Sequence, residues 1–178
     1  EFWFLEVNTR LQVEHPVTEE VTGIDLVSEQ LKIARGEPLG FSQEEITWTG
    51  SSIEARLYAE DPNNDFLPEI GTLIAFEKNN SAEARWDSGV KTGTIVGTDF
   101  DPMLAKIITF ATNRTDAASK LAKALESAHI GGVKTNRDFL INCLKTKEFL
   151  EGDTTSDFIE RVNPSRKLEI NKAEIEHV

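Results

Sequence analysis

The sequence is poor in sulfur, with one cysteine, Cys143, and one methionine, Met103. A single thiol cannot form an internal disulfide, which favours a reducing compartment. Cys143 lies in the apolar stretch 139–144, which is typical of a buried structural thiol and not of a nucleophile. Long apolar runs are also missing, and none approaches the roughly 20 residues that would cross a bilayer. The composition therefore argues against a disulfide framework and against a membrane span.

Basic residues are scarce as well. The 19 lysines and arginines stand against 31 aspartates and glutamates, which gives a formal net charge of −12. Broad affinity for nucleic acid or for an anionic membrane is not expected, because both need a basic surface. Anionic ligands must instead meet a few cations placed in a pocket. The hydrophobic share of 39% is sufficient for the core of one domain, or of one domain plus part of another.

The chain opens on the bulky run Glu-Phe-Trp-Phe-Leu, without an initiator methionine. This composition predicts a buried strand over residues 2–7. A chain that opens inside a buried strand is expected to be part of a longer protein. The mature amino terminus of a processed protein is the simpler alternative.

Strands mixed with later helices, without strict alternation of the two, predict an α+β fold. Along residues 52–60, apolar side chains alternate with Glu54, Arg56 and Tyr58, which predicts a half-buried strand followed by a turn at 61–64. The other elements expected from periodicity and turn residues are strands at 72–76, 84–87 and 104–112 and helices at 22–34, 116–128, 136–144 and 155–161, the last with a threonine able to cap it.

Polar residues recur at alternate positions after the first expected strand, at Glu6, Asn8, Arg10, Gln12 and Glu14. A solvent-facing strand edge is the simpler explanation, but charged groups that leave a buried strand need partners. The oxygens of Glu6 and Asn8 can bind one hard cation such as Mg²⁺ or Mn²⁺. Arg10 offers a planar fork for a small oxyanion such as bicarbonate or phosphate, and Glu14 can act as a general base beside it.

The spacing of these residues adds a geometric condition. Eight residues of straight strand would separate Glu6 from Glu14 by about 26 Å, too far for one reaction centre. The chain is therefore predicted to curl after Asn8. We expect His15 to be structural and to hold this curl.

The motif Glu-x-Asn-x-Arg at 6–10 resembles the metal-binding signature of the ATP-grasp superfamily. Its continuation Gln-Val-Glu-His-Pro-Val-Thr-Glu at 12–19 resembles the biotin carboxylase version of that signature. Further segments that resemble this family follow in the family's order, at 53–62, 100–106, 132–136 and 149–154. Together the resemblance covers about residues 1–162.

The resemblance implies the carboxyl-terminal end of an ATP-grasp domain over residues 1–48. A biotin carboxylase C-terminal domain, with a small antiparallel sheet and helices, is then implied over 49–162. The charged composition beyond it predicts a flexible tail over 163–178. The implied activity makes carboxyphosphate from ATP and bicarbonate and then carboxylates N1 of biotin on a carrier domain. The implied location is the cytoplasm, or the mitochondrial matrix if the source is a eukaryote.

Carried over residue by residue, the resemblance makes Glu6 and Asn8 ligands of Mg²⁺ or Mn²⁺ at the ATP phosphates, so that Glu6 is also an ATP contact. Glu14 is implied to deprotonate bicarbonate so that it can attack the γ-phosphate. The groups implied to hold bicarbonate are the side chains of Arg10 and Gln12 and the backbone amide of Val13.

Arg56 is implied to stabilise the enolate-like oxygen of biotin once N1 loses its proton, because a fixed cation lowers the barrier where negative charge develops. Without the resemblance, Arg56 would be expected to pair with Glu54 or Glu60 on the same face of its strand. The remaining implied sites are Asp101 as support for the biotin region, Val133 in the adenine pocket, and Arg85 either at a homodimer surface or as a plain surface residue.

The family's lysines for the ATP phosphates, its glycine-rich lid and a first metal-binding carboxylate lie upstream of the matching segment. A biotin-attachment lysine flanked by methionines is also missing. The chain alone is therefore expected to be inactive, with a biotinylated carrier domain, a carboxyltransferase subunit and a second copy as partners of the parent. A dimerisation or assembly module and another ATP-grasp ligase are the alternatives. The segments 87–90 and 149–161 look most like acyl-CoA carboxylase α chains, although acetyl-CoA, propionyl-CoA, pyruvate and other acceptors stay open.

Overall fold

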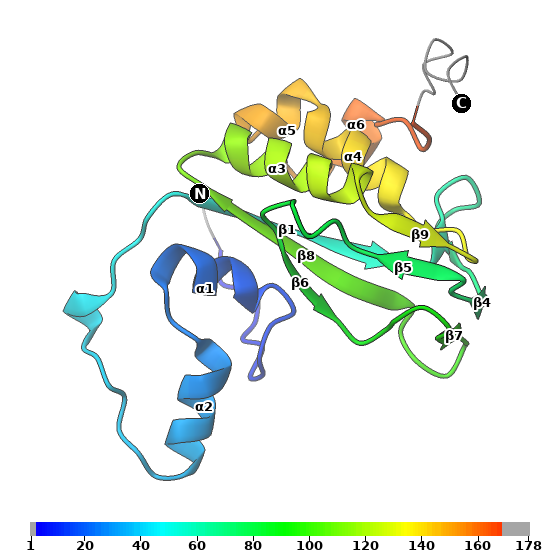
Figure 1. The fold of residues 1–178 in the computed structure, drawn as a ribbon. Helices are drawn as coiled ribbons and strands as arrows, with labels where there is room; N and C mark the ends of the chain where they lie inside the picture. The colour runs from blue at the N-terminus through cyan, green and yellow to red at the C-terminus, as the bar shows by residue number, and fades with distance from the viewer. Residues whose placement is uncertain (1–2, 169–178) are drawn as a thin grey trace.

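A three-stranded antiparallel sheet in the order β1-β8-β6 lies at the centre of the molecule (Figure 1). The computed structural model describes residues 3–168. The strands are β1 at Ser51–Tyr58, β8 at Met103–Ala111 and β6 at Arg85–Ser88. Helices α3 (Arg114–Glu126) and α4 (Arg137–Lys145) lie on one side of this sheet. The predicted α+β class with a small antiparallel sheet is confirmed.

The core lies between β1, β8 and α3. Every second residue of β1 points into it, so that Ala55 and Leu57 are buried while Arg56 between them is exposed. From α3, Leu121 and Leu125 meet these strands and are fully buried. Asn113 caps α3 by accepting a hydrogen bond from the backbone amide of Asp116 at 2.9 Å. The apolar stripe and this cap together explain why the helix forms and which face it buries.

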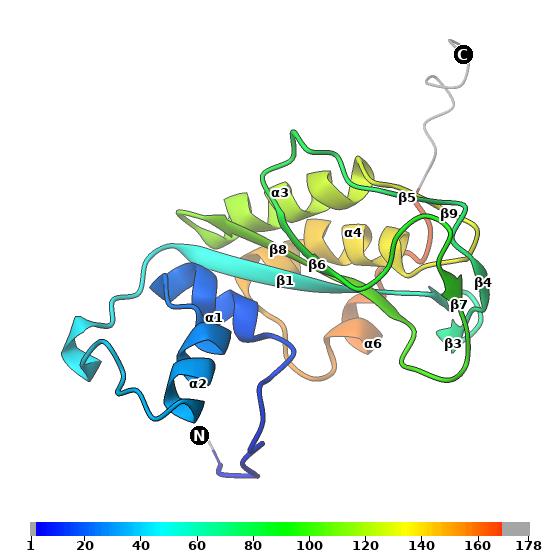
Figure 2. The ribbon, with the colours of Figure 1, turned by 60° about the horizontal axis from the view of Figure 1, so that its bottom comes forward.

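Helices α1 (His15–Thr22) and α2 (Leu26–Ala34) lie on the other side of the sheet, where α1 contacts β1 and β8 (Figure 2). The predicted single helix at 22–34 is wrong in its start, because Gly23 adopts a left-handed conformation with φ 73° and separates two helices. α1 was not predicted. Its Pro16 sits in the first turn, where the missing N–H costs nothing.

The predicted strand at 2–7 is also wrong. Residues 3–9 have no regular secondary structure, and Trp3, Phe4 and Leu5 are exposed. A strand exists only where a neighbour takes up its backbone hydrogen bonds, and no segment within 3–168 pairs with these residues. The apolar composition alone therefore did not suffice to predict a strand here.

The remaining elements are short pairs at the edges of the sheet and helices near the carboxyl end. The strand pairs are β2 (Glu60–Asp61) with β3 (Leu67–Pro68), β4 (Gly71–Thr72) with β7 (Ile95–Val96), and β5 (Ala75–Glu77) with β9 (His129–Gly131). The other helices are the 3₁₀ turn η1 (Gln43–Glu45), α5 (Lys147–Glu151) and α6 (Phe158–Val162).

The strands predicted at 52–60, 84–87 and 104–112, the helices at 116–128 and 136–144 and the turn at 61–64 are confirmed within about two residues at most ends. The strand predicted at 72–76 is split between β4 and β5, and the last predicted helix is the shorter α6. β9 and α5 were not predicted. The Thr155 hydroxyl bonds to the Asp157 carboxylate and does not cap α6, whereas Thr146 caps α5.

The predicted loose tail is held against the domain over its first residues. Asn142 donates hydrogen bonds to the carbonyls of Ser165 and Lys167, and Arg166 donates to the carbonyl of Pro62 at 2.8 Å. Residues 169–178 lie outside the described part of the chain. Among residues 3–168, no helix has the length and apolarity that a membrane crossing requires.

Candidate functional site

The face of the sheet beneath α1 carries charged side chains, and strand register places them in rows. Arg56 on β1, Lys106 on β8 and Asp87 on β6 lie opposite one another across the three strands. Side chains at directly paired positions are about 5 Å apart at Cβ. The next row consists of Glu54, Ile108 and Arg85. We call this surface the charged face, in contrast to the apolar face that meets α3.

Glu14, in the turn before α1, forms an ion pair with Arg56 of the charged face. Nη2 of Arg56 donates to Oε2 of Glu14 at 2.8 Å, across 42 positions of sequence. The Arg56 and Glu14 side chains are 43% and 55% exposed, so solvent and other ligands can reach both groups. The expectation that Arg56 pairs with Glu54 or Glu60 on its own strand is wrong. The structure instead joins the predicted base to the predicted biotin-stabilising cation.

The segment between Asn8 and α1 curls, as predicted. The backbone amide of Arg10 donates to the carbonyl of Asn8 at 2.9 Å, and that of His15 donates to the carbonyl of Gln12 at 3.3 Å. As a result Arg10, Gln12 and Glu14 line one open cavity of about 500 Å³, whose other wall comes from α2. Three of the residues predicted for bicarbonate chemistry are therefore brought together.

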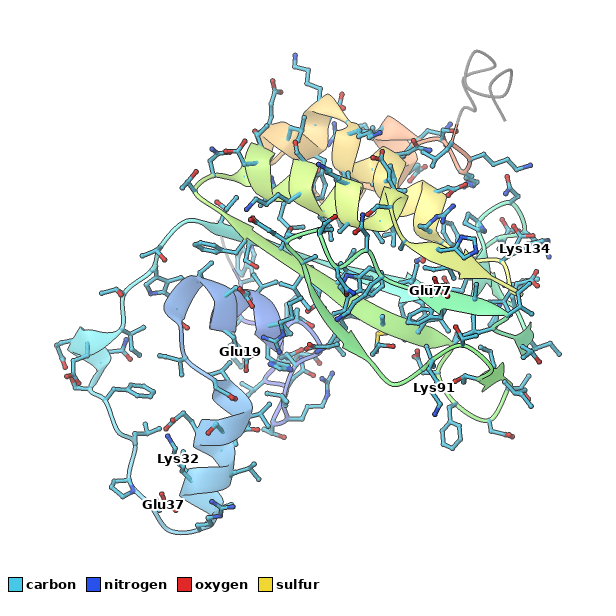
Figure 3. All side chains as sticks on the ribbon, viewed as in Figure 1. Glu19, Lys32, Glu37, Glu77, Lys91 and Lys134 are labelled. Carbon is cyan, nitrogen blue, oxygen red and sulfur yellow. The ribbon has the colours of Figure 1, made fainter. Side chains whose placement is uncertain are left out.

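Glu19 connects α1 to the sheet and to α2. Its carboxylate is 8% exposed, and it accepts hydrogen bonds from Arg85 Nη1 at 2.7 Å and from the backbone amide of Leu26 at 2.9 Å. His15 Nδ1 lies 3.1 Å from Glu19 Oε1, a close polar contact at a poor hydrogen-bond angle. Burial raises the pKa of Glu19, but Arg85, His15 and Leu26 outweigh it, so the pKa lies below its usual range. Figure 3 labels Glu19 on α1.

Arg85 and His15 both belong to this connection. Besides Glu19, Arg85 binds Asp87 through Nε at 2.9 Å and Nη2 at 2.8 Å. Its charge is thus engaged within the chain, and the predicted dimer contact stays a prediction. His15 holds the curl through its contacts with Glu19 and Lys106, in agreement with the structural role predicted for it.

Glu54 lies on the charged face beside Arg56, and sequence reasoning did not single it out as a candidate site residue. Both of its carboxylate oxygens are buried without a hydrogen-bond partner among the described residues. Burial raises its pKa to about 7, against the opposing charges of Lys106 and Arg56 and with the help of Glu14 and Asp87. The alternation along β1 showed which face Glu54 shares with Arg56, but nothing in the sequence showed that α1 would cover it.

Asn136 was also missed, although it lies in one of the quoted motifs. Its side-chain oxygen accepts from the backbone amide of Tyr58 at 2.9 Å, and its side-chain nitrogen donates to the carbonyl of Arg56 at 3.1 Å. The backbone amide of Asn136 donates to the carbonyl of Tyr58 at 3.2 Å. These bonds fix the backbone of the strand that carries Arg56.

Other predicted site residues lie apart from this group. Glu6 and Asn8 are exposed on the irregular segment before the curl, and residues 3–168 contain no cluster of three or more acidic, histidine or cysteine ligands for a metal. Asp101 lies in the loop before β8, where its carboxylate accepts from the amide of Met103 at 2.9 Å. Val133 lies after β9 and lines a different cavity, of about 630 Å³, together with Lys134. Figure 3 labels Lys134 at the end of the molecule far from Glu19.

Cys143 is partly buried on α4, and burial raises the pKa of its thiol to about 11. A thiol in this state stays protonated near neutral pH and is a poor nucleophile. The structural role predicted for it agrees with this environment.

Two known protein families match segments of this chain. The biotin carboxylase C-terminal domain matches residues 54–161, and the ATP binding domain of the carbamoyl-phosphate synthase L chain matches residues 1–42. The first match alone covers more than half of the chain. The chain belongs to the biotin carboxylase family.

Relatives in this family are similar over most of the chain. Biotin carboxylase 2 of Bacillus subtilis is 49% identical over 90% of this chain and 36% of its own length. The mitochondrial methylcrotonoyl-CoA carboxylase subunit alpha of Rattus norvegicus is 47% identical over 89% of this chain and 22% of its own length. The predicted likeness to acyl-CoA carboxylase α chains is confirmed. The chain spans only about a third or less of the length of these relatives.

Solved structures of biotin carboxylases confirm the fold. The biotin carboxylase domain dimer of the Hydrogenobacter thermophilus 2-oxoglutarate carboxylase, in complex with MgADP, ADP and bicarbonate, has a TM-score of 0.90 at 39% identity. The match covers 94% of this chain and 37% of that one. The biotin carboxylase subunit of a pyruvate carboxylase has a TM-score of 0.87 at 40% identity, over 92% of this chain and 36% of that one.

Proposed function

We propose that this chain is the carboxyl-terminal part of a biotin carboxylase, which uses ATP and bicarbonate to carboxylate N1 of biotin through carboxyphosphate. The observation that carries the proposal is the 2.8 Å ion pair between Glu14 and Arg56. The roles predicted for these two residues require them in one reaction centre, although they are far apart in sequence. The bicarbonate and MgADP bound by the Hydrogenobacter thermophilus domain support the same reaction.

The geometry suits successive steps on two substrates. Arg10 and Gln12 line the same cavity as Glu14, where bicarbonate would bind and pass its proton to the Glu14 carboxylate. The Val13 amide would be a further donor to bicarbonate. Arg56 approaches Glu14 from the sheet, and its guanidinium would stabilise the oxygen of deprotonated biotin beside this pair. One exposed pair thus provides both a base and an electrophilic group, within hydrogen-bonding distance of each other.

We assign Glu6 and Asn8 as the residues that would hold Mg²⁺ or Mn²⁺. Their carboxylate and amide oxygens are the donors that such cations prefer, and both side chains are exposed to an incoming nucleotide. A cation bound there would neutralise negative charge on the ATP phosphates. Val133 stays a proposed adenine contact and Asp101 a proposed support of the biotin region.

We propose the division into an ATP-grasp end (1–48), a C-terminal domain (49–162) and a tail (163–178). The parent protein would act on a biotinylated carrier domain, together with a carboxyltransferase subunit, as a homodimer in the cytoplasm or the mitochondrial matrix. The dimeric Hydrogenobacter thermophilus domain and the mitochondrial α subunits among the relatives support this. Those α subunits also favour an acyl-CoA as the final acceptor.

The chain alone is proposed to be inactive. It covers 36% of Biotin carboxylase 2 of Bacillus subtilis, and the phosphate-binding lysines and the lid of the family lie outside the matching segment. The test is ATP hydrolysis by the isolated chain, with and without bicarbonate. Hydrolysis that depends on bicarbonate would refute this part of the proposal.

The function itself is tested in the full-length protein that contains this chain, by biotin- and bicarbonate-dependent cleavage of ATP. We expect Glu14→Gln and Arg56→Gln each to lose about 100-fold or more of the rate. The matched controls are Glu126→Gln and Arg161→Gln, which remove half of an exposed ion pair elsewhere. Wild-type rates in both site variants would favour the assembly module, and ATP cleavage that needs a different acceptor would favour another ATP-grasp ligase.

A further inference from the structure

Lys106 occupies the centre of the charged face but has no role in the reaction described above. It lies on the middle strand β8, directly opposite Arg56 on β1 and Asp87 on β6. Its side chain is 14% exposed, which is unusual for a lysine, because burying an ammonium is costly unless its donors are used. The partners of the Lys106 ammonium therefore show which parts of the chain this buried side chain connects.

Two of the three partners of Lys106 belong to the curl that carries Glu14. Nζ donates to the carbonyl of Val13 at 3.1 Å and lies 3.3 Å from Nε2 of His15. The third partner is the Asp87 carboxylate, at 3.7 Å. An ammonium group has three N–H donors and no acceptor. One donor binds the Val13 carbonyl, a second lies within hydrogen-bonding distance of His15, and Asp87 adds an ion pair at longer range. The lysine thus joins the sheet to residues on both sides of Glu14.

The contact with His15 also fixes the state of that ring. Because Lys106 can only donate, a hydrogen bond at this contact requires Nε2 of His15 to accept, and the tautomer that allows this carries its proton on Nδ1. Nδ1 is the atom that faces Glu19, 3.1 Å away. The side chain that starts α1 therefore contacts the sheet through Nε2 and lies beside the Glu19 carboxylate through Nδ1.

The hydrogen bond from Lys106 to the Val13 carbonyl holds the backbone directly before Glu14. Glu14 directly follows the carbonyl that Lys106 holds, and the amide of Val13 is the proposed backbone donor to bicarbonate. A reaction centre requires its groups to be held within about 0.5 Å of the productive geometry, and a displacement of about 1 Å can cost 100-fold in rate. Arg56 and Lys106 are paired across neighbouring strands. The same sheet therefore positions Arg56 directly and Glu14 through Lys106.

We propose that Lys106 is a positioning residue for the carboxylation, which holds the turn 13–15 against the sheet so that Glu14 and the Val13 amide stay in place relative to Arg56. This inference rests on the proposed function. It differs from a purely structural role in its consequence: loss of the ammonium affects the binding of bicarbonate and leaves the binding of ATP nearly unchanged.

The experiment uses the full-length protein with Lys106→Met, which keeps the length of the side chain and removes the donors. We expect the KM for bicarbonate to rise about tenfold and kcat to fall, with the KM for ATP changed less than twofold. The matched control is Lys120→Met. Nζ of Lys120 also binds a carboxylate, Glu83, and a backbone carbonyl, that of Phe110, but on a different part of the sheet. This control is expected to have wild-type kinetics.

A thermal melt of each variant shows whether it is folded at the assay temperature. A folded Lys106→Met protein with the wild-type KM for bicarbonate overturns the inference. If Lys106→Met is unfolded, Lys106→Arg decides, since it keeps the charge but not the ammonium geometry. A selective rise of about threefold in the KM for bicarbonate supports the inference, and no change, or equal changes for both substrates, overturns it. Absence of bicarbonate-dependent ATP cleavage in the wild type would instead refute the proposed function.

Discussion

The two faces of the three-stranded sheet differ in polarity and in exposure to solvent. The face that meets α3 is apolar and closed, with Leu57 and Leu121 fully buried. The charged face, which meets α1, holds ions in rows and leaves Arg56 and Glu14 half open to solvent. Because side chains alternate along β1, the same strand contributes residues to both faces. The packing of the apolar face therefore also holds the backbone that carries Arg56. The comparison shows how a closed core can position an exposed pair of charged side chains, the proposed reaction centre.

The largest effect on stability is expected on the apolar face. Leu57→Ala removes a fully buried side chain and leaves a cavity, which should lower the free energy of unfolding of the chain by about 3 kcal/mol. Urea denaturation measures this. Ile74→Ala is the control, since Ile74 is largely exposed, and should change the free energy of unfolding by less than about 0.5 kcal/mol. Equal effects at the two positions would contradict this description of the core.

The next effect concerns the anchor of the charged face. Glu19→Ala leaves the Arg85 guanidinium with one partner fewer and the amide of Leu26 without its acceptor. We expect a loss of about 2 kcal/mol in the free energy of unfolding, measured in the same denaturation experiment. Glu20→Ala, next to it and only 3.7 Å from Arg85, should cost about 0.5 kcal/mol or less. If both variants behave alike, Glu19 does not anchor α1.

The pH dependence of stability tests the unpartnered carboxyl of Glu54. Its pKa is raised from 4.5 to about 7 in the folded chain, so the folded state holds this proton more tightly than the unfolded state does. The resulting stability is fully present below about pH 4.5 and is lost as the pH rises toward and through 7. Glu54→Gln should remove this part of the decline between pH 5 and pH 8, as followed by urea midpoints across that range. An unchanged pH dependence in the variant would show that Glu54 is ionised when folded.

The smallest effect on stability is expected at the pair with the largest effect on activity. The Glu14 and Arg56 side chains are about half exposed, and such ion pairs contribute roughly 0–1 kcal/mol. Glu14→Gln should therefore leave the urea midpoint of the chain nearly unchanged. A loss above about 2 kcal/mol would mean that Glu14 is held for structure and would weaken its assignment as a base.

The apolar face was predictable from sequence and the charged face was not. Periodicity alone gave β1, β8 and α3, since burial repeats every second residue in a strand and every three to four in a helix. It failed at residues 2–7, where strand-like composition has no pairing partner among the described residues, and at Gly23, where one backbone conformation divides a helix. Motif resemblance picked out Glu14 and Arg56 as candidate site residues. Their contact, and the burial of Glu54 and Lys106, depend on where α1 docks, which is a long-range property that local patterns do not contain.

The bonds that Asn136 makes to β1 have a consequence for behaviour in solution. β1 is an edge strand, and an edge with free amide and carbonyl groups can add a strand from another molecule. Here the amide and carbonyl of Tyr58 and the carbonyl of Arg56 are already occupied by one asparagine. The residue that fixes the backbone beside Arg56 thereby also blocks part of the sheet edge against pairing with another molecule, while the Arg56 side chain stays accessible to solvent.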